Sequence, residues 1–343
     1  MQRLGAAVIG AGYWGPNLVR NLSAHDGVDL RWVCDLDSDR AQRAIGRYGR
    51  VSTTCDLEVV LDDPTVDMVA IATPASTHVD IGLAALDAGK HVLIEKPLAS
   101  STEGGRKLVG AARDAGLVLM CDHTYCFTPA VQRIRSLIDS GELGEVLYVD
   151  SVRVNLGLVQ SDIDVVWDLA PHDLSILDHV LPAGSRPTAV AATGADPVRA
   201  GQRCVAHMSL PLGNGGIAHS HVNWLSPTKI RRIVVGGSRR MLVWDDLQPA
   251  QRLQVFDAGV QIEGGEDEHH ARMVSYRTGD MMAPALPERE ALSGVIDELV
   301  ASIEGGRPPT TSGESGLRVL EVLEATSRSF AEGGALIELE HAW

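Results

Sequence analysis

Three side chains of types that move protons stand out in the sequence: Lys96, Asp168 and His172. Lys96 is followed by Pro97, which cannot continue strand pairing and so fixes a turn. A lysine held by such a turn can hydrogen-bond a substrate oxygen. Asp168 and His172 are four residues apart, which places them one turn apart on a helix. Because a carboxylate beside an imidazole sets its tautomer and stabilises its charged form, the spacing predicts acid–base chemistry.

Plainer interpretations of the same residues stay open at this level. Lys96 could be a surface lysine beside an ordinary turn, and Asp168 could be the N-cap of an apolar helix that opens in the segment Trp167–Asp173. With Asp168 as N-cap, Pro171 falls in the first helical turn, where its missing N–H is harmless. His172 would then be a histidine satisfied locally.

A glycine-rich motif predicts a dinucleotide site. Gly10, Gly12 and Gly15 form GxGxxG between an expected strand and an expected helix. Such glycines allow a tight turn, close approach of the backbone to a pyrophosphate and close helix packing. Asp35 ends the next expected strand, where a carboxylate accepts hydrogen bonds from the ribose hydroxyls and repels a 2′-phosphate. With no arginine following it before Arg40, the motif favours NAD over NADP.

The elements that must position these residues alternate in the first part of the chain. Near-continuous apolar strands with a helical segment at Ser76–Gly89 are typical of a parallel sheet covered on both faces. The predicted fold class is therefore α/β, with a doubly wound Rossmann domain over residues 1–123. Thr73 and Lys96 follow strands, at the edge where such sheets bind ligands. The expected strands are 6–9, 30–34, 68–72 and 91–94.

Residues 124–343 are predicted to form a separate α+β domain with an open, mainly antiparallel sheet. Segments 205–210 and 217–224 alternate like strands and are joined by Gly213–Gly216, a strong hairpin signal. Further strands are expected at 146–155, 230–235 and 241–244, and helices at 130–140, 290–304 and 316–329.

Composition and charge limit the classes of partner. Of the 343 residues, 45 are acidic and 30 basic, so the formal net charge is -15 and phosphate backbones or anionic lipids are disfavoured. No stretch approaches the ~20 apolar residues of a membrane span, and no signal-peptide pattern is visible. The 5 cysteines show no CxxC pair and the histidines lack metal-ligand spacing. We expect a cytoplasmic protein with free thiols, no metal, no nucleic acid and no membrane partner.

Taken together, the motifs resemble those of the Gfo/Idh/MocA oxidoreductases over essentially the whole chain. The matching motifs are Gly10-x-Gly12-x-x-Gly15-x-Asn17, Ala72-Thr73-Pro74, Glu95-Lys96-Pro97 and Asp168-x-x-x-His172. Within the family, the segments Gly12–Asn17, Asn155–Leu158 and Trp167–Asp173 look like the branch of UDP-N-acetyl-2-amino-2-deoxyglucuronate 3-dehydrogenases. Such enzymes oxidise a sugar C3 hydroxyl to a ketone, which a partner aminotransferase converts to an amine.

The resemblance implies roles for particular residues, beginning with Lys96, Asp168 and His172 as the catalytic group. Whether Lys96 or His172 accepts the proton stays open. Residues expected to bind the NAD cofactor are Gly10, Gly12, Tyr13, Trp14, Gly15, Asp35, Thr73, Pro74, His78, Glu95 and Lys96. Residues expected to bind substrate are His123, Tyr125, Arg153, Asn155, Gln160, Asp162, Asp164 and His172. The family also implies a homodimer or homotetramer formed through the C-terminal sheet.

The substrate is less well defined than the reaction. A uronate calls for an arginine fork, and Arg153, on the same strand face as Asn155, is the local candidate. Asp162, Asp164 and the charge of -15 would instead suit an amine-bearing aminoglycoside. Three hypotheses follow: a nucleotide-sugar 3-dehydrogenase, the same oxidation of an aminoglycoside, or a non-catalytic NAD-binding regulator. The intact catalytic group argues against the third.

Overall fold

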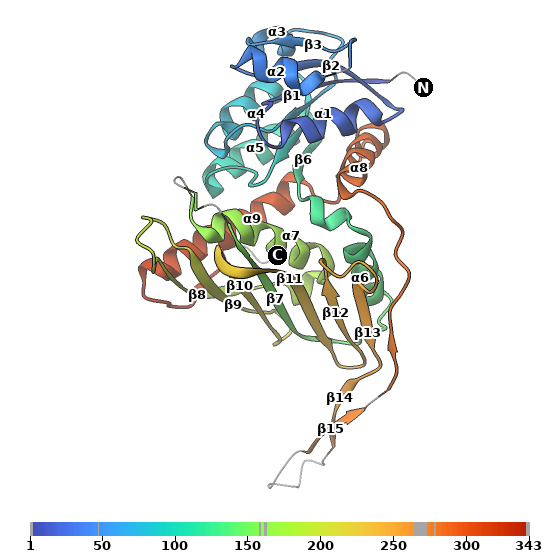
Figure 1. Ribbon diagram of the computed structural model, residues 1–343, viewed down its shortest axis with the longest axis vertical. Coiled ribbons are helices and arrows are strands. Elements are labelled where there is room, and N and C mark those ends of the chain that lie inside the picture. The colour runs from blue at the N-terminus through green and yellow to red at the C-terminus, as the bar shows by residue number, and fades with distance from the viewer. Residues whose placement is uncertain are drawn as a thin grey trace. The chain divides into compact units, whose positions relative to one another are not determined.

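A computed structural model describes residues 3–46, 48–157, 159–160, 163–263, 273–277 and 279–340 (Figure 1). The chain forms two compact units, and each is described by itself. The first unit is Met1–Thr128 with Arg289–Glu321, and the second is Pro129–Glu288 with Val322–Trp343. The division differs from a single boundary at residue 123, because the chain returns to the first unit at Arg289.

The first unit contains a six-stranded sheet whose strands all pair in parallel, in the order β3-β2-β1-β4-β5-β6. The order reverses between β1 and β4, and such a switch point is where doubly wound sheets bind ligands. The predicted α/β fold class is confirmed. The strands are β1 Leu4–Ile9, β2 Val28–Cys34, β3 Ser52–Thr54, β4 Met68–Ile71, β5 His91–Glu95 and β6 Leu119–Asp122. The short, partly exposed β3 gave no apolar signal in the sequence.

Helices cross between these strands. They are α1 Gly15–Ala24, α2 Ser38–Ile45, α3 Leu57–Leu61, α4 His78–Asp87 and α5 Thr102–Ala115, with short 3₁₀ helices at Ala75–Thr77 (η1) and Thr124–Phe127 (η2). The returning helix α8, Ala291–Gly305, buries Leu292 and Val295 in the same core as Leu18 of α1. The start of the last helix, α9 Gly313–Ala331, follows Thr311, whose carbonyl accepts from the Cys121 N–H of β6 at 2.8 Å. The Rossmann sheet is therefore completed by residues near the C-terminus.

The second unit contains a nine-stranded sheet in the order β16-β13-β12-β11-β7-β10-β9-β8-β17. Strands β7 and β10 pair in parallel, and the other neighbouring strands of this sheet pair antiparallel among the described residues. The hairpin expected at Gly213–Gly216 joins β9 to β10. The strands are β7 Val146–Leu156, β8 Ala189–Ala195, β9 Val205–Pro211, β10 Ile217–Asn223, β11 Leu225–Gly237, β12 Met241–Asp245, β13 Leu253–Phe256, β16 Met281–Met282 and β17 Ile337–Glu338. A separate two-stranded ribbon pairs β14 Gly259–Glu263 with β15 Met273–Arg277 (Figure 1).

Helices cover one face of this sheet. α6 Pro129–Asp139 packs on α7 Val165–Val180, which lies against β10. α9 contacts β8 through Ser329 and β9 through Thr326. A 3₁₀ helix, η3, spans Ala183–Ser185. Side chains alternate accordingly: Met208 and Val222 are buried, whereas His207 and His219 face outward. The sheet has one solvent-exposed face and one buried face, which explains why polar and apolar residues alternate along these strands in the sequence.

Candidate active site

The three glycines of the glycine loop have different structural roles, and together they leave room for a pyrophosphate. A Cβ on Gly10 would lie 2.7 Å from the backbone of Ala72, and one on Gly15 would lie 2.2 Å from the Gly10 carbonyl oxygen. Gly10 also has φ of +93°. These two positions therefore need glycine for packing. A Cβ on Gly12 would meet nothing within 4 Å, so this position leaves open space beside the first turn of α1, where N–H groups attract anions.

Asp35 lies at the end of β2 as predicted, and the backbone holds its carboxylate. Oδ2 accepts from the Ala11 N–H at 2.7 Å, and Oδ1 accepts from the Asp37 N–H at 2.9 Å. The Arg40 guanidinium lies 3.7 Å from Oδ1. A buried carboxylate fixed beside the glycine loop suits ribose hydroxyls.

An open pocket of about 550 Å³ lies against the glycine loop and α2. Its lining residues are Ala11, Gly12, Tyr13, Pro16, Arg40, Arg43 and Ala44. Tyr13, expected to bind cofactor, is 95% exposed there. The space above Gly12, the helix N-terminus and the carboxylate at the end of β2 together fit a dinucleotide.

The turns after β4 and β5 are tied together by His78, the first residue of α4. Its ring is buried, with Nε2 2.9 Å from the Thr73 carbonyl oxygen and Nδ1 2.9 Å from the Pro97 carbonyl oxygen. Burial lowers the pKa of His78, while the two carbonyl acceptors act in the opposite direction. The ring thus links the backbone after β4, at Thr73, to the backbone after β5, at Pro97, the residue that follows Lys96. Direct contact of His78 with the cofactor stays a prediction.

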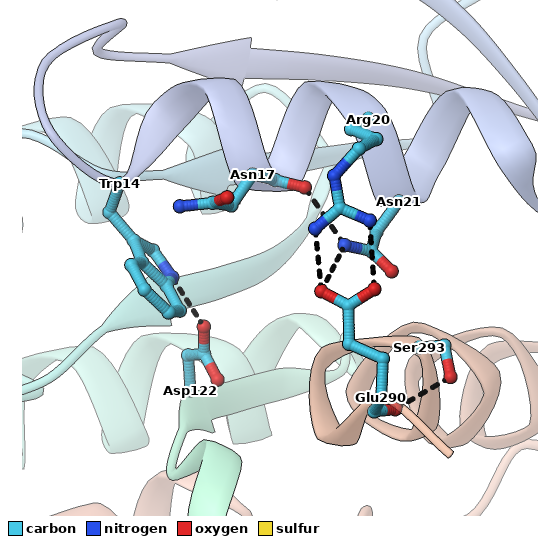
Figure 2. A network of polar contacts seen from close by, with 7 residues as sticks. All are labelled: Trp14, Asn17, Arg20, Asn21, Asp122, Glu290 and Ser293. Carbon is cyan, nitrogen blue, oxygen red and sulfur yellow. Dashed lines mark hydrogen bonds and ion pairs between the residues drawn. The ribbon is translucent and has the colours of Figure 1, made fainter. Parts of the chain in front are cut away.

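A residue that the sequence did not single out, Asp122, completes the carboxyl edge of the first sheet. It ends β6 in register with Glu95 of β5, and its side chain is 1% exposed. The Trp14 indole N–H donates to Asp122 Oδ2 at 3.0 Å (Figure 2), and the Thr124 hydroxyl donates to Oδ1 at 2.7 Å. The sequence offered one signal for Asp122: an acidic residue at the end of an apolar segment, on the strand that follows the one ending at Glu95.

Burial raises the pKa of both carboxyls, and the charge of Asp122 adds to the rise at Glu95. The pKa of Glu95 lies well above its usual range, because of burial and then the neighbouring charge of Asp122, while Lys96 acts to lower it. Burial also raises the pKa of Asp122, against the stabilising hydrogen bonds from Thr124 and Trp14. Two acidic groups and one lysine therefore form a single coupled set at the ends of β5 and β6.

Two expected substrate residues lie just beyond this set, in the first unit. His123 is 1% exposed, and its backbone bridges Cys121 and Cys126 at the start of η2. Tyr125, within η2, is partly exposed, and its carbonyl accepts from Thr128. Their contact with substrate stays a prediction.

In the second unit, the predicted capping of α7 is wrong. Asp164, not Asp168, is the N-cap, and its Oδ1 accepts from the Val166 and Trp167 N–H groups at 3.0 and 3.2 Å. The helix starts one turn earlier than expected, so Pro171 lies inside it rather than in its first turn. Burial raises the pKa of Asp164, against these hydrogen bonds and the nearby Arg203. This carboxylate, expected to bind substrate, is thus engaged in capping.

Asp168, which does not cap the helix, lies in the first turn of α7, four residues before His172. Its Oδ2 accepts from the indole N–H of Trp224 at 2.9 Å. Trp224 joins β10 to β11 and is 1% exposed. Asp168 and His172 are both partly exposed, on one face of the helix. A buried indole therefore fixes the carboxylate that is predicted to orient the histidine.

Arg153 is placed differently from the expected substrate fork. It is buried, and its Nε and Nη2 donate to Asp173 Oδ1 of α7 at 3.0 and 2.7 Å. Asn155, further along β7, is partly exposed, and Gln160 is exposed. Asp162 lies outside the described residues.

Comparison with known proteins places the chain in a family. Residues 4–123 match the NAD-binding Rossmann domain of the Gfo/Idh/MocA oxidoreductases, and residues 135–339 match the C-terminal alpha/beta domain of the same family. The chain belongs to this oxidoreductase family, and its cofactor is NAD. The predicted family, the enzymatic activity as an oxidoreductase and the NAD cofactor are confirmed.

Particular relatives match nearly the whole chain. UDP-N-acetylglucosamine 3-dehydrogenase of Acidithiobacillus ferrooxidans is 28% identical over 333 residues, covering 93% of this chain and 95% of the relative. A solved structure of that enzyme matches with a TM-score of 0.78 and 28% identity, covering 96% and 99%. GenD2 from gentamicin A biosynthesis, solved with NAD, matches with a TM-score of 0.82 and 27% identity, covering 99% and 97%. Inositol 2-dehydrogenase of Rhizobium meliloti is 27% identical over 340 residues, covering 95% and 96%.

Two structural features are absent from the described residues. They contain no helix long and apolar enough to cross a membrane. Across the same residues, no group of three or more His, Cys, Asp or Glu side chains could hold a metal ion.

Proposed function

We propose that the protein oxidises the C3 hydroxyl of a nucleotide-linked sugar to a ketone. The observation that carries the proposal is the near full-length similarity, in sequence and structure, to a UDP-N-acetylglucosamine 3-dehydrogenase. NAD, when bound at the glycine loop, would supply the hydride acceptor for this oxidation. Arg153 is paired with Asp173 inside the second unit. The proposed substrate is therefore a UDP-sugar whose binding does not depend on a carboxylate held by Arg153.

The catalytic roles are divided between a proton acceptor and an oxygen ligand. His172, oriented by Asp168, takes the proton of the C3 hydroxyl. Lys96 donates a hydrogen bond to the same oxygen and stabilises the negative charge that develops on it. The bond from Trp224 to Asp168 supports this assignment, since it holds the orienting carboxylate in one position. The same residues serve reduction of the ketone in the reverse direction.

NADH formation tests this function directly. The purified protein is mixed with NAD and UDP-N-acetylglucosamine, and NADH absorbance is followed beside parallel samples with free aminoglycosides. Reduction of NAD with the UDP-sugar alone supports the proposal, and product analysis then locates the ketone. No turnover in either direction with any UDP-sugar, despite measured NAD binding, contradicts it, and reduction of NAD with an aminoglycoside alone favours oxidation of that class of substrate instead.

A second candidate is the same oxidation of an aminoglycoside. It is favoured by the similarity to GenD2 from gentamicin A biosynthesis, which covers nearly all of both chains. The net charge of -15 suits a cationic substrate. The salt dependence of KM separates the two candidates, because recognition of an amine by exposed carboxylates weakens once charges are screened beyond ~10 Å at 0.1 M salt.

Partners follow from this chemistry and from the second sheet. A ketone on an amino-sugar precursor is a substrate for transamination, so we propose an aminotransferase as the consumer of the product.

We also propose that the outward face of the nine-stranded sheet forms a homodimer or homotetramer. That face carries a shallow hollow of about 480 Å³ over β7 to β10, with His207 and His221 stacked at 4.1 Å between ring centroids. Light scattering measures the assembly.

A further inference from the structure

Trp14 spans the carboxyl edge of the first sheet. It belongs to the glycine loop that follows β1, yet its indole N–H bonds Asp122 at the end of β6. In the strand order, β4 and β5 lie between β1 and β6. A dinucleotide crosses this edge at the switch point. Because Asp35 of β2 suits the adenosine ribose, the nicotinamide half falls on the side of β4, β5 and β6, where Trp14 meets Asp122.

The helix that follows the glycine loop has a second, independent attachment. Arg20 of α1 forms a bidentate ion pair with Glu290, and the Asn21 amide donates to the same carboxylate at 3.3 Å (Figure 2). Glu290 precedes α8 and lies 270 residues from Arg20 in sequence. Since this pair already holds α1 to the unit, the Trp14–Asp122 bond is not required to attach the helix.

The hydrogen bonds decide which carboxyl of the coupled set carries negative charge. Asp122 accepts from both the Trp14 N–H and the Thr124 hydroxyl, and each donor stabilises its ionised form. The pKa of the neighbouring Glu95 is raised well above its usual range. Asp122 is therefore the carboxyl of this set whose ionised form the hydrogen bonds favour, although burial raises its pKa as well.

We propose that Asp122, held by Trp14 of the glycine loop, is a charge-setting residue of the nicotinamide end of the cofactor site. The nicotinamide ring of NAD carries a positive charge, whereas that of NADH is neutral. A buried carboxylate at this edge attracts the first and is indifferent to the second. Asp122 thus strengthens NAD binding relative to NADH. The inference depends on cofactor binding alone and does not require the proposed sugar substrate.

The test is the ratio of the dissociation constants for NAD and NADH, measured by calorimetry without sugar. Asp122→Asn preserves the shape of the side chain and removes its charge. We expect it to weaken NAD binding about tenfold while NADH binding changes less than about twofold. Asp114→Asn, an equal charge change on the exposed end of α5, is the matched control and leaves the ratio unchanged. Equal weakening of both cofactors, or no change in either, overturns the proposal.

A second variant keeps the proposal testable if Asp122→Asn fails to fold. Trp14→Phe keeps an aromatic ring but removes the donor, so it raises the pKa of Asp122 and moves the loss of NAD affinity in acid to higher pH. The charged or titratable groups around Asp122 are Glu95 of β5, Lys96 directly after that strand, and the buried thiols Cys121 and Cys126. The acid limb belongs to the carboxyls, because burial raises the pKa of Cys121 well above the range concerned. An NADH affinity that follows the same limb contradicts the inference.

Discussion

The two units hold their candidate functional side chains in different ways. In the first unit, backbone groups close to strand ends fix two of them: two N–H groups hold Asp35, and two carbonyls flank the ring of His78. Asp122 is the exception there, because the side chains of Trp14 and Thr124 hold it. In the second unit, side chains hold side chains over long separations in sequence. Trp224 reaches Asp168 across 56 positions, and Arg153 reaches Asp173 across 20.

This difference shows which functional features depend only on residues that are close in the sequence. A glycine turn or a proline after a strand creates its geometry within a few residues, so changing a neighbouring side chain leaves it largely intact. A carboxylate fixed by a distant indole depends on the whole sheet and helix between them. We therefore expect the first unit to retain NAD binding after changes that abolish catalysis, and the second to be sensitive at its buried pairs.

The largest expected effect is on turnover. Lys96→Ala and His172→Ala should each lower kcat by about 10²- to 10⁴-fold, because each removes a group that acts on the reacting oxygen. The dissociation constant for NAD should change little, since the backbone of the glycine loop is untouched. Lys107→Ala, which removes an exposed lysine paired with Glu103 on α5, is the control. Near-normal turnover in both catalytic variants would remove the assignment.

Next in size is the buried ion pair of the second unit. Arg153→Ala should lower the free energy of unfolding by about 3–5 kcal/mol, because Asp173 is left buried and uncompensated. Arg232→Ala breaks the more exposed pair with Asp245 on the same sheet and should cost about 1 kcal/mol or less. Urea titrations of the two variants compare them. Similar losses would show that burial does not distinguish the pairs.

The same contrast explains what the sequence could predict. The apolar strands β1, β2, β4 and β5 and the hairpin at Gly213–Gly216 were predictable because apolar period and turn residues are local signals, whereas the short, partly exposed β3 gave no such signal. The N-cap of α7 was misplaced because Asp164 and Asp168 are both acceptable caps, and only packing decides between them. Asp122 was missed because its importance comes from Trp14, 108 residues away. The same holds for Arg153, whose partner Asp173 no motif indicates.

A smaller effect is expected at the indole that holds Asp168. Trp224→Phe keeps most of the buried volume but removes the donor to Oδ2, so Asp168, one helical turn before His172, is held less firmly. We expect kcat to fall about tenfold with the KM for NAD unchanged. Trp244→Phe, at an equally buried tryptophan of β12, controls for the lost volume. A loss of unfolding free energy without a change in kcat would make Trp224 purely structural.

The smallest effect separates two uses of an indole donor. Trp32 donates to Asp63 at 2.7 Å in the first unit, and with the hydrogen bonds from Thr65 it lowers the pKa of Asp63 to about 2. Because this value lies below that of the unfolded chain, about 3.9, the contribution to stability is complete above pH about 4 and is lost as the pH falls toward 2.

Trp32→Phe raises the pKa of Asp63 in the folded state, so the variant should be less stable at neutral pH by less than about 1 kcal/mol. That deficit should shrink as the pH falls through the same window, which urea titrations from about pH 7 to about pH 3 measure. Trp167→Phe, whose indole donates to the neutral hydroxyl of Ser327, should show a deficit that does not vary with pH. If both deficits vary alike with pH, the carboxylate of Asp63 is not the cause of the pH dependence.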